Sequence, residues 1–234
     1  MYEYFIFDIL LGFLWLALFL RFRKLRKEIM FGSVIYPSIL ILLFLLTWLL
    51  SQFFDLTWRY TPDYWNPNTL FNLIRITGGL SIEDFLFMFF FGGIVSIAYE
   101  VLFKRKSVRA KKKHHILSLV GFVGSYLFIA FLFSFNPIYN LIISSFVGFL
   151  IMLLQRPDLF KHALWSACIF TALYFLGFFL FNLVFPYALS TYWNLNALSG
   201  VLLFNVPLEE FLYAFSFGLM WGPLYEYVKG KKIK

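Results

Sequence analysis

The sequence predicts an all-α polytopic membrane protein with seven transmembrane helices, an external N-terminus and a cytoplasmic C-terminus. Of its 234 residues, 62% are hydrophobic and only 14% are charged, whereas a soluble domain carries about 25% charged residues. The apolar residues form long runs, and the basic residues gather in short segments between these runs. Together these observations predict a multi-pass protein of the cell membrane, with the lipid bilayer as its main surroundings.

Seven runs have the roughly 20 mainly apolar residues that a spanning helix needs. The first run follows Glu3 and has its basic residues on its far side, the reverse of a cleavable signal peptide, so we expect a retained helix. The third and seventh runs are long enough to tilt, kink or project from the bilayer. In chain order the runs cover residues 4–20, 33–51, 69–100, 116–134, 137–154, 163–185 and 197–228.

The basic residues predict the orientation. With seven helices, 18 of the 20 Lys and Arg residues fall on one side of the membrane, and the other two are Arg59 and Arg75. Cytoplasmic loops carry the excess of Lys and Arg, so this side is predicted to be the cytoplasm. The net charge of +8 therefore indicates topology, and we expect no nucleic-acid partner. The basic segments are residues 21–32, 101–115, 155–162 and the C-terminal tail.

An internal repeat relates the third run to the seventh. Residues 64–68 read Tyr-Trp-Asn-Pro-Asn, and residues 192–196 read Tyr-Trp-Asn-Leu-Asn. Residues 81–86 read Ser-Ile-Glu-Asp-Phe-Leu, and residues 207–212 read Pro-Leu-Glu-Glu-Phe-Leu. Further matches follow at Phe91-Gly92 with Phe217-Gly218 and at Tyr99-Glu100 with Tyr225-Glu226.

Both copies of this repeat lie on helices that run from outside to inside, so the two halves are predicted to be parallel. We expect a 3+1+3 arrangement, in which residues 1–103 and 137–234 form three-helix repeats related by a pseudo-twofold axis along the membrane normal. A basic loop and a linking helix over residues 104–136 join them.

The repeat brings four carboxyl groups together. If both helices run unbroken from residues 69 and 197, these acids lie about 20 Å from the outer ends, near the bilayer centre. Ionisable residues at that depth mark functional sites. Desolvation and mutual repulsion are expected to hold at least one acid neutral, which suits general acid and base catalysis. The four candidate catalytic residues are Glu83, Asp84, Glu209 and Glu210.

The residues before the acids are predicted to kink or loosen the two helices. Pro207 comes just before its pair, while Ser81 stands at the matching place, with Gly78 and Gly79 nearby.

Aromatic residues surround the acids in the sequence. Aromatic faces stabilise a nearby cation by about 0.5–2 kcal/mol each, which suits protonation of an alkene and shelter of the carbocation. The repeated Trp residues are also expected at the outer interface, as a contact between the halves or a rim for substrate access. The candidate substrate-binding residues are Phe87, Phe91, Tyr213, Phe217, Trp221, Trp65 and Trp193.

Polar residues near the basic segments receive simpler interpretations. We expect Glu100 and Glu226 to be interfacial residues or ion-pair partners of Lys and Arg. The histidines His114, His115 and His162 have no helical partner at metal-ligand spacing, so they are predicted to be solvated, and no metal site is expected.

The Pro-x-Glu-Glu motif at Pro207, Glu209 and Glu210, repeated in two parallel halves, resembles the membrane lycopene cyclases of the archaeal, heterodimeric and fungal fused type. The first copy keeps the acids but has Ser81 in place of the proline. The resemblance implies carotenoid biosynthesis by an intramolecular lyase or isomerase, which converts the ψ ends of lycopene into β-ionone rings. It favours Glu209 and Glu83 as the principal acid and base, tuned by their neighbours.

The resemblance also implies an apolar carotenoid substrate drawn from the membrane and a redox-neutral reaction. No Gly-x-Gly-x-x-Gly motif follows a strand, so we expect no cofactor. A homo-oligomer stays open. The alternatives are a proton- or cation-coupled transporter, which would also use repeated acids at mid-membrane, and a cyclase relative acting on another isoprenoid lipid. A retinal protein is disfavoured because Lys229 comes after the last helix ends.

Overall fold

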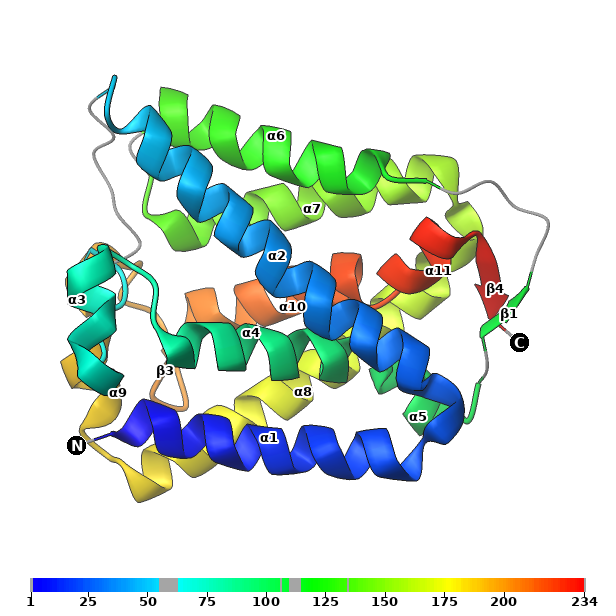
Figure 1. The fold of residues 1–234 in the computed structure, drawn as a ribbon, viewed down its shortest axis with the longest axis horizontal. Helices are drawn as coiled ribbons and strands as arrows, with labels where there is room; N and C mark the ends of the chain where they lie inside the picture. Colours follow the sequence, from blue (N-terminus) through cyan, green and yellow to red (C-terminus); the bar gives the residue numbers. More distant parts are fainter. Residues whose placement is uncertain (1, 55–62, 106, 110–114, 134, 234) are drawn as a thin grey trace.

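The computed structural model describes residues 2–54, 63–105, 107–109, 115–133 and 135–233. The fold is all-α, with short strands at two places (Figure 1). Arg59 and His114 lie outside the described residues. The α-helices are α1 (Glu3–Arg21), α2 (Arg26–Leu50), α3 (Leu73–Thr77), α4 (Ile82–Val95), α5 (Ala98–Phe103), α6 (Leu117–Leu132), α7 (Pro137–Gln155), α8 (Phe160–Val184), α9 (Ala188–Tyr192), α10 (Leu208–Trp221) and α11 (Leu224–Lys229).

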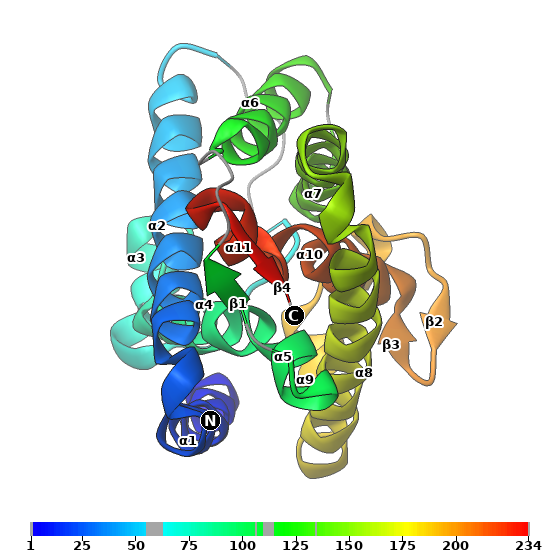
Figure 2. The ribbon, with the colours of Figure 1, turned by 90° about the vertical axis from the view of Figure 1, so that its right-hand side faces the viewer.

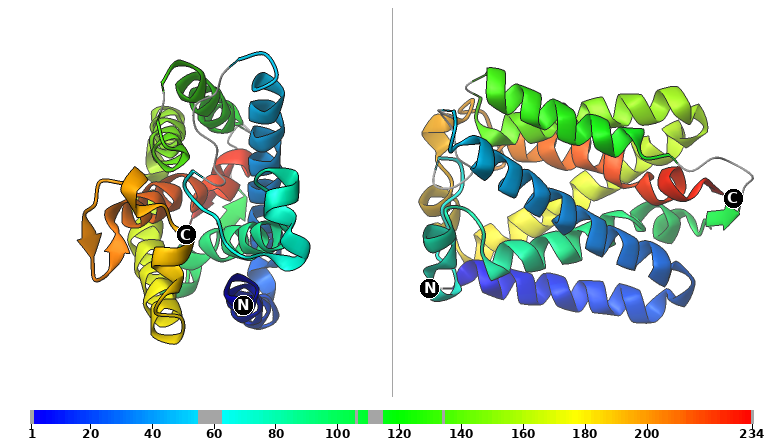
Figure 3. Two further views of the ribbon diagram at one scale, coloured as in Figure 1. Left: turned by 90° about the vertical axis from the view of Figure 1, so that its left-hand side faces the viewer. Right: turned by 45° about the horizontal axis from the view of Figure 1, so that its top comes forward.

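Shorter elements connect these helices. Two pairs of antiparallel strands form, β1 (Ser107–Arg109) with β4 (Lys231–Ile233) and β2 (Leu202–Leu203) with β3 (Val206–Pro207). The β2–β3 hairpin projects from the flank of the bundle (Figures 2 and 3). The 3-10 helices are η1 (Arg23–Leu25), η2 (Leu70–Asn72), η3 (Pro157–Leu159) and η4 (Leu195–Ala197).

Five helical stretches are long and apolar enough to cross a membrane. Helix α6 has 16 residues and α10 has 14, both shorter than a full span. The prediction of an all-α membrane protein is therefore confirmed at this level, while the count of seven spans and their orientation stay predictions. The five stretches are Glu3–Arg21, Arg23–Leu50, Ile82–Phe103, Pro137–Gln155 and Pro157–Val184.

The long helices run alternately in opposite directions, and the two chain termini lie at opposite ends of the bundle (Figure 1). Helix α10 is the most enclosed, because ten of its 14 residues are buried. It packs against α7 and α8, while α4 packs against α1 and α2, and α6 lies along α7. The end with α3 and α9 is called the N-terminal end here, and the end with β1 and β4 the C-terminal end (Figures 1 and 3).

The predicted spans over residues 69–100 and 197–228 are not single helices. Helix α4 begins only at Ile82, and α3 lies across its end instead of extending it (Figure 1). Gly78 and Gly79 separate the two helices with φ angles of 75° and 144°, a region that glycine adopts without steric cost. The depth of about 20 Å assumed continuous 1.5 Å steps, and so it no longer follows.

In the second copy of the repeat, a β-hairpin and not a pair of glycines precedes the helix. Phe204 and Asn205 both have positive φ and form the two-residue turn between β2 and β3, as type I′ hairpins require. Pro207 then closes the hairpin and directly precedes α10. The predicted proline kink is therefore wrong, because the proline marks the start of the helix, where its missing N–H is not needed.

Equivalent glycines form the tightest helix contacts in both halves. Gly92 on α4 packs against the backbone of Gly32 on α2, and Gly218 on α10 packs against Ala167 on α8. A methyl group added to Gly218 would lie 2.5 Å from the Cα atom of Ala167. Small residues let helix backbones approach closely, as is common inside membranes.

The two halves are joined at both ends by reciprocal backbone pairing. At the N-terminal end, Asn66 N–H donates to the carbonyl of Tyr192 (2.9 Å) and Asn194 N–H donates to the carbonyl of Tyr64 (3.0 Å). At the C-terminal end, β1 pairs with β4. Reciprocal contacts of this kind are the signature of a twofold relation. The predicted boundaries at residues 103 and 137 stay a prediction.

Candidate active site

A cavity of about 440 Å³ lies at the N-terminal end of the bundle, between both halves. Asp84 of α4 and Glu210 of α10 line it, and helices α2, α6, α7 and α8 contribute apolar walls. Trp48, with 56% of its side chain exposed, lines the cavity beside the exposed Ser51 and Gln52. The cavity therefore reaches the surface at the end of α2, and also at α3, where the exposed Arg75 and Ile76 line it.

Asp84 occupies the first turn of α4, where its carboxylate caps the helix. Ser81 Oγ accepts a hydrogen bond from Asp84 N–H (3.1 Å), and Ser81 N–H donates to Asp84 Oδ2 (2.9 Å). This capping box fixes both residues at the start of the helix. Tyr4 of α1 donates its hydroxyl to the other oxygen, Oδ1, at 3.0 Å. Asp84 is thus held in one orientation, on the cavity wall.

Glu210 accepts three side-chain hydrogen bonds. Tyr174 donates its hydroxyl to Oε2 at 2.6 Å, and Trp193 Nε1 donates to Oε1 at 2.7 Å. Tyr64 donates its hydroxyl to Oε1 as well. Tyr64 belongs to the first half, so this contact crosses between the repeats. Hydrogen bonds to both oxygens stabilise the carboxylate form.

Glu83 and Glu209 do not line this cavity and bind backbone outside it. Glu83 Oε1 accepts a hydrogen bond from Leu70 N–H at 2.6 Å. Glu209 Oε1 accepts one from Ser199 N–H at 2.7 Å and one from the hydroxyl of Tyr139 at 2.6 Å. Each of these two acids therefore ties the segment before its helix to the first helical turn. Adjacent residues on a helix point about 100° apart. For this reason Asp84 and Glu210 face the cavity while Glu83 and Glu209 face away from it.

Asp8 is a further carboxyl group that the sequence reasoning missed. It lies on α1 with no exposed surface, and neither oxygen has a hydrogen-bond partner among the described residues. Asp84 and Glu83 are the charged groups that act on it. An acid in the middle of an apolar run was the available signal, because ionisable residues inside a spanning helix mark functional sites.

The seven predicted substrate-binding aromatics separate into two groups. Four line the cavity, namely Phe87, Tyr213, Trp65 and Trp193. The other three, Phe91, Phe217 and Trp221, are buried in the core between α4, α10 and their neighbours. Both repeated tryptophans meet across the halves with ring centroids 4.0 Å apart, so the predicted contact between halves is present.

Tyrosines form a larger part of the cavity wall than the sequence suggested. The hydroxyls of Tyr36 and Tyr213 lie 2.5 Å apart, which links α2 to α10 beside the acids. Phenylalanine is the commonest aromatic residue in the chain, so the sequence pattern did not single out the tyrosines as cavity residues. The tyrosines on the wall are Tyr4, Tyr36, Tyr64, Tyr126, Tyr174 and Tyr213.

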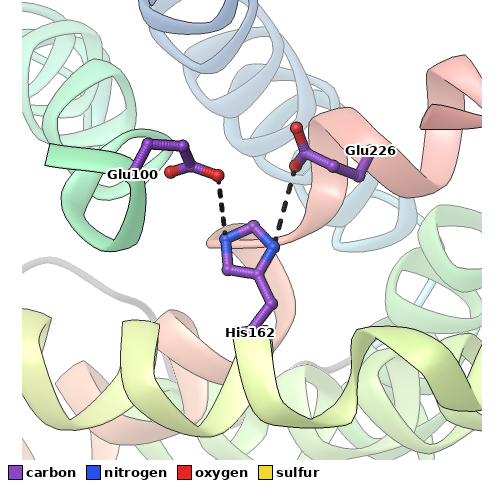
Figure 4. Close-up of side chains that lie close together, drawn as sticks. All are labelled: Glu100, His162 and Glu226. Carbon is purple, nitrogen blue, oxygen red and sulfur yellow. Dashed lines mark ion pairs between the residues drawn. The ribbon is translucent and has the colours of Figure 1, made fainter. Parts of the chain in front are cut away.

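A second polar cluster lies toward the C-terminal end of the bundle (Figure 4). His162 Nε2 lies 3.3 Å from Glu100 Oε1, and His162 Nδ1 lies 3.9 Å from Glu226 Oε2. All three residues are buried, so the prediction of a solvated His162 is wrong. Both glutamates contact this histidine. His115 is half-buried and stacks on Tyr227.

Comparison with known proteins identifies the family. A family model described as lycopene cyclase matches residues 2–102 and 136–228. The chain belongs to the lycopene cyclase family. Each matched stretch holds one copy of the repeat. No curated protein and no solved structure matches the chain. The family resemblance predicted from the Pro-x-Glu-Glu motif is confirmed, and with it an enzyme of the cyclase type in carotenoid biosynthesis.

Proposed function

We propose that this chain is a lycopene β-cyclase of the cell membrane, which closes β-ionone rings on the ψ ends of its substrate. One observation carries the proposal, namely that Asp84 and Glu210, one acid from each repeat, face the same aromatic-walled cavity. An acid and a base on one cavity wall are what a proton-catalysed isomerisation needs. The reaction gains and loses no electrons, so it needs no nucleotide cofactor as oxidant or reductant.

The reaction begins with proton transfer from Asp84 to the terminal double bond of the ψ end. The new C–H bond uses the π electrons and leaves a tertiary carbocation, and the neighbouring double bond attacks this cation to close the ring. Glu210 then removes a ring proton, and the freed electron pair forms the ring double bond. The rings of Phe87, Tyr213 and Trp193 shelter the cation.

Asp8 supports the acid role of Asp84. Two carboxyl groups close together in a dry site do not both ionise readily, so the pair holds a proton between them. Asp84 faces the cavity and Asp8 does not, so Asp8 acts as the proton reserve and Asp84 as the donor. Asp84 and Glu210 each accept three hydrogen bonds, so the neighbouring acid Asp8 is what distinguishes Asp84 as the donor, and Glu210 takes the part of the base.

These roles reverse the assignment that the sequence favoured. Glu83 and Glu209 were expected to be the principal acid and base, but their hydrogen bonds go to Leu70, Ser199 and Tyr139. We therefore assign them as positioning residues that hold each helix start in place.

The substrate reaches the site from the bilayer. The mouth at Trp48 lies among exposed apolar residues of α2, such as Leu45 and Leu49. An apolar polyene partitions into the lipid, so it would enter the cavity from the bilayer. The same proposal includes seven spans, with α4–α5, α6 and α10–α11 completing the set. The alternation of the helices (Figure 1) supports this count.

Pigment analysis in lycopene-accumulating cells tests the proposal. Expression of the unaltered protein is expected to yield β-ring carotenoids, and Asp84→Asn and Glu210→Gln are expected to lower cyclisation by about 10²-fold or more. The matched neighbours Glu83→Gln and Glu209→Gln are expected to keep at least about a tenth of the activity, since their role is positional.

Three outcomes would contradict it. Unchanged lycopene with well-expressed protein would exclude this substrate and favour a relative acting on another isoprenoid. Full activity of Glu210→Gln together with an inactive Glu209→Gln would restore the sequence-based roles. Proton-coupled flux in vesicles without ring formation would support a transporter instead.

A further inference from the structure

The cluster of Glu100, His162 and Glu226 joins three helices near the C-terminal end. Glu100 comes from α5, His162 from α8 and Glu226 from α11, and Figure 4 shows the imidazole between the two carboxyl groups. One oxygen of each glutamate and one ring nitrogen all lie within 4.8 Å of one another. The cluster therefore links the two repeats at the end opposite to the cavity.

The histidine in this cluster is buried and lacks hydrogen bonds. Only 3% of its surface is exposed, and within the described chain neither nitrogen has a hydrogen-bond partner. Glu100 is 1% exposed, and neither of its carboxylate oxygens has a hydrogen-bond partner among the described residues. Buried polar groups in native proteins are almost always satisfied, and buried carboxylates require a compensating cation or proton. These side chains point at one another, so a bound species between them would satisfy them together.

The repeat explains how the donor set arose. His162 is the third residue of α8, and Glu28 is the third residue of α2, the equivalent helix of the first half. Glu100 and Glu226 are likewise equivalent, and Glu28 acts electrostatically on Glu100. A fully symmetric repeat would thus place four carboxyl groups here, two from each half. At the position equivalent to Glu28, the second half has the imidazole of His162 instead. The result is a set with nitrogen and oxygen donors.

We propose that Glu100, His162 and Glu226 bind a divalent first-row transition-metal ion that fastens the two repeats together. Zinc binds His nitrogen and carboxylate oxygen at about 2.0–2.2 Å, so two of its ligand atoms lie about 3.3–3.5 Å apart. The separation of 3.3 Å between Glu100 Oε1 and His162 Nε2 already matches this spacing. Glu226 Oε2 lies against the other ring nitrogen, Nδ1, at 3.9 Å, so this carboxyl group moves toward the ion when it binds. An imidazole ligand favours Zn²⁺, Fe²⁺ or Mn²⁺ over Ca²⁺, and the absence of a thiolate from this set disfavours Cu⁺.

The neighbouring residues suit a structural ion. The ring of Tyr99 lies 4.6 Å from that of His162 and limits its rotation. Arg156 donates a hydrogen bond to the main-chain carbonyl of Glu226 (3.3 Å), while its ion pair is with Asp158 at 2.9 Å. The two carboxylates supply the charge that a divalent ion requires, and the metal would hold α5, α8 and α11 in register.

Metal titration of tag-free protein in detergent tests this site. After chelator treatment, the unaltered protein is expected to bind one Zn²⁺ per chain, with a higher melting temperature in Zn²⁺ than in chelator. His162→Ala and Glu100→Gln are expected to weaken Zn²⁺ binding by at least about 100-fold, since each removes a direct ligand. His115→Ala is the matched control and keeps the affinity of the unaltered protein.

Cobalt provides a second measurement, because its visible absorption reports on the ligands. Co²⁺ added to the unaltered protein is expected to give d–d bands that His162→Ala abolishes. Equal Zn²⁺ affinity of His162→Ala would overturn the proposal. So would a melting temperature of the unaltered protein that depends on pH but is unaffected by chelator and Zn²⁺, since a protonated histidine would then hold the carboxylates. That last measurement needs no variant, so it decides even if the variants fail to fold.

Discussion

The two carboxyl groups on the cavity wall differ in their surroundings. Asp84 is part of a helix cap and has a second acid, Asp8, behind it. Glu210 is surrounded by hydroxyl and indole donors from both repeats. Equivalent positions in the repeat have thus acquired different chemical surroundings. In the proposed mechanism, this difference allows Asp84 to give a proton and Glu210 to take one.

Substitution of Asp8 separates its catalytic role from a structural one. A buried carboxyl without hydrogen-bond partners costs stability, so Asp8→Asn is expected to keep or raise the melting temperature while cyclisation falls about 10²-fold. Asp8→Glu is expected to recover part of the activity, because it restores the acid. Pigment yield and thermal unfolding of the purified protein measure both effects.

A purely structural Asp8 would give the opposite result, with lower stability and activity lost only in proportion to the folded protein. The pH profile of cyclisation is the additional control. It is expected to change in Asp8→Asn and to be unaffected by Tyr139→Phe, which contacts Glu209 outside the cavity.

At the residue level, the sequence pointed to the acids but did not give the direction in which each side chain faces. The repeat identified all four acids, because polar residues at matching places in apolar runs are conspicuous. It did not identify which member of each adjacent pair faces the cavity, since this depends on where the helix begins and what packs on it. Asp8 and the tyrosines have no counterpart in the repeat motifs, so pattern comparison passed over them.

At the scale of elements, the two helices with the acids begin in different ways at equivalent places. Ser81 starts α4 by a capping box, and Pro207 starts α10 by closing a hairpin. Both solutions put the acids in the first turn, where free N–H groups and the helix dipole favour negative charge. In the first copy Ser81 stands in place of the proline, and like Pro207 it marks the start of the helix.

Helix packing at Gly218 gives a prediction with an internal control. Gly218→Ala would force the added methyl group against the Ala167 backbone, which is part of a rigid helix, so we expect a loss of about 1–3 kcal/mol from overpacking. Gly124→Ala, on α6, meets no atom within 4 Å and is expected to be neutral or to stabilise by up to about 1 kcal/mol. Thermal unfolding in detergent compares the two.

Equal destabilisation by both substitutions would show that helix propensity, and not the close α8–α10 contact, sets the stability. A Gly218→Ala protein as stable as the unaltered one would show that α8 and α10 move apart at little cost.

Element boundaries were the weakest part of the sequence prediction. Residues 69–81 and 197–207 are almost as apolar as the spans that follow, so hydropathy merged them with α4 and α10. The signals that separate them are local, namely Gly78-Gly79 and the Phe204-Asn205 turn. The bounds of α1, α6 and α7 were predicted within two residues, because charged or polar residues lie at their ends.

At the scale of the whole molecule, cysteine labelling tests the proposed topology. In a Cys168→Ala background, Asn196→Cys lies at the N-terminal end and Lys232→Cys at the C-terminal end, and both positions are exposed. A membrane-impermeant maleimide is expected to label the former in intact cells and the latter only after permeabilisation, as the excess of basic residues predicts.

Labelling of both positions from the same side would mean that α10–α11 does not cross the membrane, which would contradict the seven-helix arrangement. Reversed labelling would keep this span and invert its orientation. The sequence alone supported the 3+1+3 arrangement through the direction of its repeats, and it offered a contact between the halves at Trp65 and Trp193 as one interpretation. It had no means to detect the pairing of the two basic segments.

The shared cavity has a consequence for a long molecule whose two ends are alike. In the proposed mechanism its acid comes from one repeat and its base from the other, so the two repeats together provide one reaction site and not one for each end of the substrate. A linear tetraterpene must therefore dock, leave, turn end for end and dock again to become bicyclic. Between these two visits the half-finished pigment diffuses freely among the lipids, and the balance of one-ring and two-ring products is set by how quickly it returns.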